Sequence, residues 1–159
     1  TFGPSYLMEF RGMAIATSGL VSMLMPATGF IAKVSSGFVS ERIGRKQAIC
    51  GAAALSGVSV LAMAHVSGDF PLALNFIFIG LVLYLFSPVI YASVTAALPT
   101  SLKSVALAVV TMIGEAFGAI STFLFGFFID VWGYQLALTF VSATVISATT
   151  LVFIYLRNW

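Results

Sequence analysis

Five stretches of the chain consist almost wholly of apolar residues, and each is long enough to cross a membrane. A transmembrane helix needs about 20 mostly apolar residues. The stretches cover residues 17–39, 47–64, 71–97, 105–129 and 135–156. Only short segments connect them. The sequence therefore predicts an all-α membrane protein, a helical bundle of five full transmembrane helices preceded by the end of a sixth at Thr1–Leu7.

Charged residues are too few to cover the surface of a water-soluble domain. Only 8% of the 159 residues are charged and 60% are hydrophobic, whereas a soluble domain has about 25% charged residues. Lipid is therefore the expected partner of most of the surface. The net charge of +2 is small and its basic residues lie between apolar runs, which argues against nucleic acid. One cysteine and one histidine give no metal-binding spacing and no internal disulfide. We expect no metal, no cofactor and no enzymatic site.

Most of the basic residues outside the apolar runs fall on one side of the predicted bundle. The connection at 40–46 holds three of them, the connection at 98–104 holds Lys103, and the C-terminal end holds Arg157. If each run crosses once, these points share one side, and the other side has Arg11 alone. The side rich in Lys and Arg faces the cytoplasm. We therefore expect a multi-pass protein of the plasma or inner membrane with a cytoplasmic C-terminus.

The connection after the first run, GFVSERIGRK, holds four of the chain's seven basic and five acidic residues. Gly37 would let a neighbouring backbone approach closely, and Gly44 would permit a tight turn. Glu41 can accept hydrogen bonds from a nearby helix N-terminus, whose dipole favours an anion. The residues that can anchor to anionic headgroups are Arg42, Arg45 and Lys46. The alternative is a plain positive-inside loop. Elsewhere, Ala53/Gly57 and Gly114/Gly118 form small-x-x-x-small pairs that predict close helix packing.

This connection resembles the G-x-x-x-D-R-x-G-R-R/K motif of the major facilitator superfamily, found between helices two and three and, often weaker, between eight and nine. LPTSLKS resembles the P-T-x-x-R/K turn after helix ten, and GFFIDVWG resembles the end of helix eleven. GPSYLMEFRGM resembles the end of helix seven and the loop that follows. The resemblance covers residues 1–159 in order, as the C-terminal half of the family fold. It departs at Glu41, where Asp is commoner, and at Lys103, where Arg is commoner.

The resemblance implies a secondary active transporter that moves a small solute by alternating access. The solute site of such proteins lies near the midplane, between two halves that rock against each other. It also implies that the chain is a piece of a longer polypeptide whose N-terminal half is its partner. Glu41 and Arg42 would then belong to a cytoplasmic latch. The alternative function is a non-transporting membrane sensor or assembly protein built on the same half.

Glu115 lies in the fourth run, about 15 Å deep at 1.5 Å per residue. A carboxylate at that depth costs roughly 2.5–3.5 kcal/mol on insertion scales, so it should face the bundle interior or water. Thr111 lies one turn earlier on the same stripe. Two interpretations stay open. Glu115 either serves packing alone, or binds the solute or exchanges protons in symport or exchange.

Lys33 lies six residues before the end of the first run. It either extends to the cytoplasmic interface or supplies a counter-charge for Glu115 or an anionic solute. In the third run, Tyr84, Ser87 and Tyr91 recur at helical spacing and share one face. The two tyrosines belong either to an interfacial aromatic belt or, together with Ser87, to the lining of a cavity. These residues suggest an organic anion or a sugar as solute and do not discriminate between the two.

Overall fold

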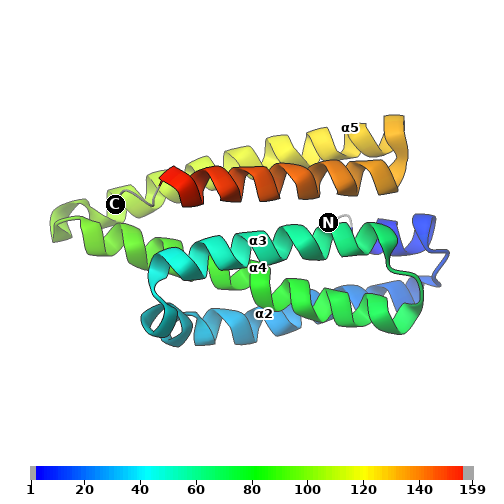
Figure 1. Ribbon diagram of the computed structural model, residues 1–159, viewed down its shortest axis with the longest axis horizontal. Coiled ribbons are helices and arrows are strands. Elements are labelled where there is room, and N and C mark those ends of the chain that lie inside the picture. Colours follow the sequence, from blue (N-terminus) through cyan, green and yellow to red (C-terminus); the bar gives the residue numbers. More distant parts are fainter. Residues whose placement is uncertain (1–2, 156–159) are drawn as a thin grey trace.

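A computed structural model describes residues 3–155 of the chain. Within that range every element is helical, and Figure 1 shows a bundle of long rods without a sheet. A short helical segment comes first, formed by α1 (Gly3–Ser5) and the π-helix η1 (Tyr6–Phe10). The long helices are α2 (Ile15–Ile43), α3 (Arg45–His65), α4 (Asp69–Ala97) and α5 (Thr100–Tyr155). The predicted all-α class is confirmed.

The predicted count of five full spans is not matched, because the described residues form four helices long and apolar enough to cross a membrane. The fourth and fifth predicted runs both fall in α5. Gly133 interrupts that helix with φ 77° and ψ 166°, a conformation that glycine adopts without a Cβ clash. The chain folds back there, so that residues 100–132 (the first arm) lie beside residues 134–155 (the second arm), as Figure 1 shows in yellow and in orange to red. Residue 156 of the predicted fifth run lies outside the described residues.

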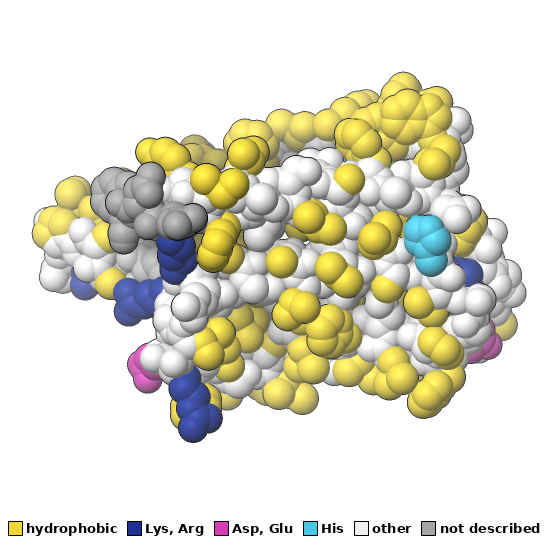
Figure 2. Space-filling model, viewed as in Figure 1, with side chains coloured by type: hydrophobic (Ala, Val, Ile, Leu, Met, Phe, Trp, Pro, Cys, Tyr) yellow, Lys and Arg dark blue, Asp and Glu magenta, His cyan; other side chains and the backbone are white. Residues whose placement is uncertain are grey.

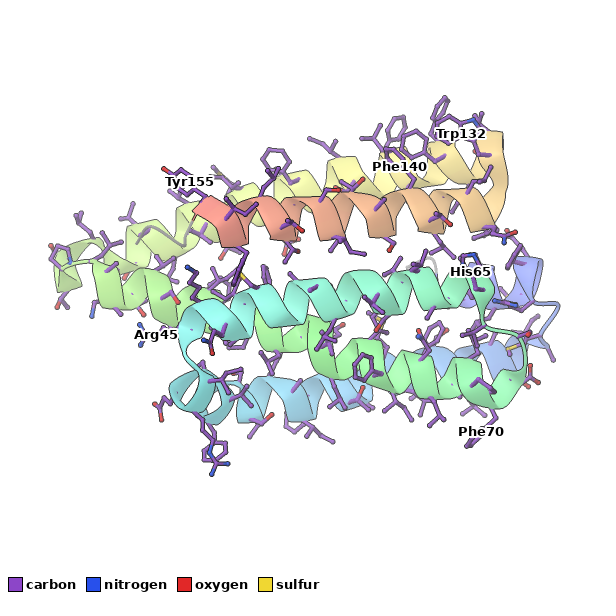
Figure 3. The ribbon with its side chains drawn as sticks, in the orientation of Figure 1. Arg45, His65, Phe70, Trp132, Phe140 and Tyr155 are labelled. Carbon is purple, nitrogen blue, oxygen red and sulfur yellow. The ribbon has the colours of Figure 1, made fainter. Side chains whose placement is uncertain are left out.

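The two ends of the bundle differ in charge. The turns between α2 and α3 and between α4 and α5 lie at one end, together with the end of the second arm (Figure 1). We call it the basic end, because Arg42, Arg45, Lys46 and Lys103 lie in or beside these turns, and Figure 2 shows dark blue side chains gathered there. In Figure 3, Arg45 lies at this end and His65 at the other, which we call the opposite end. Arg157 falls outside the described residues.

Apolar side chains cover much of the outer surface between the two ends. Phe30, Phe70 and Phe123 are 71%, 74% and 75% exposed. Figure 2 shows similar yellow side chains along the length of the bundle. In water such a surface would be a large aggregation-prone patch, whereas in a bilayer it contacts lipid tails. The described chain therefore has the surface of an integral multi-pass membrane protein.

α2 and α4 cross closely at Gly80. A Cβ atom at this position would overlap the backbone oxygen of Met25 and the hydroxyl of Thr28. The Thr28 hydroxyl lies 3.0 Å from the backbone oxygen of Ile77 and can donate a hydrogen bond to it across the interface. Small residues that let backbones approach, together with interhelical hydrogen bonds, are the usual means of packing helices in lipid.

A second close crossing joins α3 to the second arm of α5. The Ser142 hydroxyl donates to the backbone oxygen of Gly57 at 2.7 Å, and a Cβ at Gly57 would lie 2.8 Å from the side chain of Ile146. The close packing predicted for the Ala53/Gly57 pair is therefore found at Gly57. The prediction for Gly114 and Gly118 is wrong within the described residues, because a Cβ at either would have no neighbour within 4 Å.

Gly80→Ala is expected to destabilise the protein, because the new methyl group would press on the fixed backbone of α2. Overpacking of this kind costs about 1–3 kcal/mol, and each kcal/mol lowers Tm by roughly 2–4 °C in a domain of this size. Thermal unfolding in detergent measures the shift. Gly51→Ala in α3 is the matched control, because a Cβ there meets nothing within 4 Å and alanine favours helix. Equal Tm values for the two variants would contradict the close crossing.

Candidate functional site

A pocket of about 280 Å³ lies between α4 and the first arm of α5. Four polar residues line it, two from each helix, and within each pair the residues are four positions apart. Residues at this spacing lie on one face of a helix. The lining, which we call the polar pocket, consists of Phe86, Ser87, Ile90, Tyr91, Val110, Thr111, Gly114 and Glu115. Four of the six residues predicted for a solute pathway therefore meet here: Ser87, Tyr91, Thr111 and Glu115.

The polar groups of the pocket are accessible and largely free of partners. Thr111 Oγ1 lies 3.5 Å from the hydroxyl of Tyr91, a long contact that ties the two helices weakly. Thr111 and Glu115 are exposed, and Glu115 forms no hydrogen bond or ion pair with another described residue. An intramembrane carboxylate needs a polar or watery environment. The polar pocket provides one on the side of α5 that faces α4.

Lys33 and Tyr84 are not among the residues that line this pocket. The Lys33 ammonium is 5.0 Å from the centre of the Tyr84 ring, a cation–π distance. Gly29, one turn before Lys33, leaves the space that the ring fills, since a Cβ there would overlap Tyr84. Within the described residues Lys33 and Glu115 form no ion pair. The counter-charge predicted for Glu115 is therefore not found.

The charged connection between α2 and α3 turns on Gly44, whose φ of 89° and ψ of 141° belong to neither helix. The Arg42 guanidinium lies 5.4 Å from the ring of Phe38, and the Lys46 ammonium lies 5.6 Å from the ring of Phe153. The tight turn predicted at Gly44 is thus present.

Two predictions for this connection are wrong within the described residues. A Cβ at Gly37 would meet nothing within 4 Å, so no backbone approaches it closely. Glu41 accepts no hydrogen bond from a described helix N-terminus. The reason is the same for both: α2 extends to Ile43, and Gly37, Glu41 and Arg42 lie on its exposed surface.

A hydrogen-bonded cluster at the opposite end was not predicted. The hydroxyl of Tyr6 donates to the backbone oxygen of Met63, and Arg11 donates to both at 2.8 Å. Tyr134 donates to the Glu9 carboxylate at 2.8 Å. We call these five residues the opposite-end cluster. It fastens η1 to α3 and to the second arm of α5. Sequence alone shows its charges but not its long-range partners, because Met63 and Tyr134 lie more than 50 positions from the residues they bind.

The lipid-facing surface and the polar pocket define a multi-pass membrane protein with a polar site between its helices. The sequence matches the family model of the Major Facilitator Superfamily over residues 1–158. The chain therefore belongs to the Major Facilitator Superfamily, a family of membrane transporters. Its 159 residues are consistent with the predicted half of the family fold. Comparisons with curated proteins and with solved structures gave no match.

The polar pocket predicts that a cysteine at position 111 reacts with water-soluble reagents. In a Cys50→Ser background, Thr111→Cys should react with a membrane-impermeant cationic thiol reagent at least about tenfold faster than Ile113→Cys. The reason is that the reactive thiolate forms only where water reaches it, and Ile113, two residues away on the same helix, does not line the pocket. Labelling rates followed by mass spectrometry test this. Equal rates at the two positions would contradict a hydrated pocket.

Proposed function

We propose that this chain is the C-terminal half of a secondary active transporter that moves a small solute by alternating access. Its partner is a second six-helix half of the same polypeptide. The observation that carries the proposal is the convergence of Ser87, Tyr91, Thr111 and Glu115 on one pocket between otherwise apolar helices. Polar groups are costly at this depth and mark solute or ion paths in membrane proteins.

Glu115 is the group that we assign to proton coupling, in symport or exchange. It is the acidic residue of the pocket lining, and a carboxylate can gain and lose a proton as access to water alternates between the two sides. The neighbouring hydroxyls of Ser87, Tyr91 and Thr111 can donate hydrogen bonds to the ionised form and accept one from the protonated form. Both protonation states therefore have partners in the pocket.

We assign Glu41 and Arg42 to a latch at the cytoplasmic side. Both are exposed at the end of α2, so a second half can reach them. A carboxylate and a guanidinium that bind partners across the two halves would form charge-assisted hydrogen bonds. Rocking of the halves would break and remake these bonds.

Glu115→Gln is expected to abolish uptake driven by a pH gradient, because glutamine keeps the size and polarity of the side chain but cannot carry a proton. This uptake is measured in proteoliposomes that contain the complete polypeptide, with protein-free liposomes as the blank. Expression and elution as a single species should stay as in the parent.

Asp69→Asn is the matched control, since it removes an acidic group in the first turn of α4, far along that helix from the pocket. Its uptake should equal that of the parent. Uptake by Glu115→Gln that still follows the pH gradient would refute the coupling role.

The distribution of basic residues predicts the orientation in the plasma or inner membrane. Cysteines at Arg42 and Lys103 should be protected from an impermeant thiol reagent in intact cells and should react once the membrane is opened, because loops rich in Lys and Arg stay in the cytoplasm. A cysteine at Asp69 should react in intact cells. Labelling of positions 42 and 103 from opposite faces would exclude this topology.

A further inference from the structure

We propose that the polar pocket takes a solute that carries a positively charged amino group, with its ammonium against Glu115. This inference rests on the proposed transport function and names the class of solute for the same site. It follows from three properties of the pocket: its charge, its hydrogen-bonding groups and its aromatic walls.

When Glu115 is ionised, the charge of the pocket is negative and has no counter-ion among the described residues. Glu115 is the charged residue of the lining. Lys33, the counter-charge considered from the sequence, has its ammonium over the ring of Tyr84, and neither residue lines the pocket. The remaining basic residues of the described range lie at the ends of the bundle: Arg11, Arg42, Arg45, Lys46 and Lys103. An anionic solute would meet an uncompensated carboxylate here, and a charge removed from water without a partner is strongly unfavourable.

The hydrogen-bonding groups of the pocket suit a solute that donates hydrogen bonds. An ammonium group has three N–H donors and no acceptor. The pocket offers it a carboxylate at Glu115 and hydroxyl oxygens at Ser87, Tyr91 and Thr111. The long 3.5 Å contact between Thr111 and Tyr91 leaves both hydroxyls free to turn toward a ligand. A neutral solute could use the hydroxyls as well, but it would leave the charge of Glu115 unbalanced.

The walls of the pocket suit the rest of such a molecule. The rings of Phe86 and Tyr91 can attract a cation through their faces, and the side chains of Ile90 and Val110 offer apolar surface. The volume of about 280 Å³ is slightly below the range of roughly 300–1,000 Å³ that is usual for small-molecule sites. The solute is therefore a small amine with an apolar or aromatic body.

Two other pockets between the described helices lack this chemistry. One, of about 410 Å³ between α3 and the second arm of α5, is lined by Gln47, Cys50 and threonines together with apolar residues, and it contains no charged lining residue. A pocket between the two arms is lined by aromatic and aliphatic residues with Ser121 and Thr144. Neither offers a charge that would select one ionic class of solute.

Three probes with the same ring and different charge test the proposal: benzylammonium, benzyl alcohol and benzoate. Their binding to the complete polypeptide in lipid nanodiscs at pH 7 is measured by calorimetric titration, with empty nanodiscs as blank. Benzylammonium should bind at least about tenfold more tightly than either other probe, because one charge-assisted hydrogen bond contributes roughly that factor. Glu115→Gln should reduce this preference to about twofold or less. Asp69→Asn, which lies outside the pocket, should retain it.

Equal binding of the three probes, tighter binding of benzoate, or binding of none would overturn the amine assignment. So would a preference that Glu115→Gln leaves unchanged. The binding measurement needs no transport, so its outcome is separate from that of the uptake assay. A preference for benzylammonium in a protein whose Glu115→Gln variant still follows a pH gradient would sustain the solute class and reject the coupling role. If Glu115→Gln loses pH-driven uptake but the parent binds the three probes equally, the coupling role would be sustained and the solute class rejected.

Discussion

Hydrogen bonding in a solvent that offers none is the constraint on which this structure depends. Lipid cannot satisfy backbone N–H and C=O groups, so each span must satisfy its own as a helix. The hydroxyl side chains follow the same rule. Many of them return a hydrogen bond to a carbonyl three or four residues earlier in their own helix, as Ser35, Ser93 and Thr122 do. Many serines and threonines in these helices are therefore satisfied within their own helix, whereas the buried hydroxyls of Ser22 and Ser59 have no hydrogen-bond partner among the described residues.

Two hydroxyls that reach a neighbouring helix mark where the helices are held together. Thr28 reaches from α2 to α4 and Ser142 from α5 to α3, and each does so beside a glycine that lets the backbones approach. The first arm of α5 has no comparable crossing with α4, and residues 111–124 are exposed along their whole length. The polar pocket lies in this loosely packed region. The same scarcity of close contacts that leaves the first arm uncovered leaves room for a solute beside Glu115.

The sequence predicts the helices well, because runs of about 20 apolar residues have few alternatives to a membrane-spanning helix. It also groups the polar residues of the pocket into two pairs, since spacings of four place Ser87 with Tyr91 and Thr111 with Glu115 on one face of each helix. That the two faces meet comes from the structure. It fails where the answer depends on which helix lies opposite. Lys33 was a candidate partner for Glu115 by depth alone, yet the structure sets it against Tyr84. Gly37 and Gly114 look like packing glycines, but no described helix lies against them.

The opposite-end cluster is a further feature that the sequence does not predict, and it also bears on how this part of the protein could move. Its partners, Tyr6 and Arg11 with Met63, and Glu9 with Tyr134, come from segments far apart in the chain, so no local pattern reveals them. Together they tie three elements at one end. At the basic end, the aromatic contacts of Arg42 and Lys46 stay within α2 or join α3 to α5, and Glu41 is open. A half that is tied together at one end and presents the exposed Glu41 at the other is suited to move as a unit. In the proposed cycle, contacts between the two halves would break and form, and contacts within this half would stay intact.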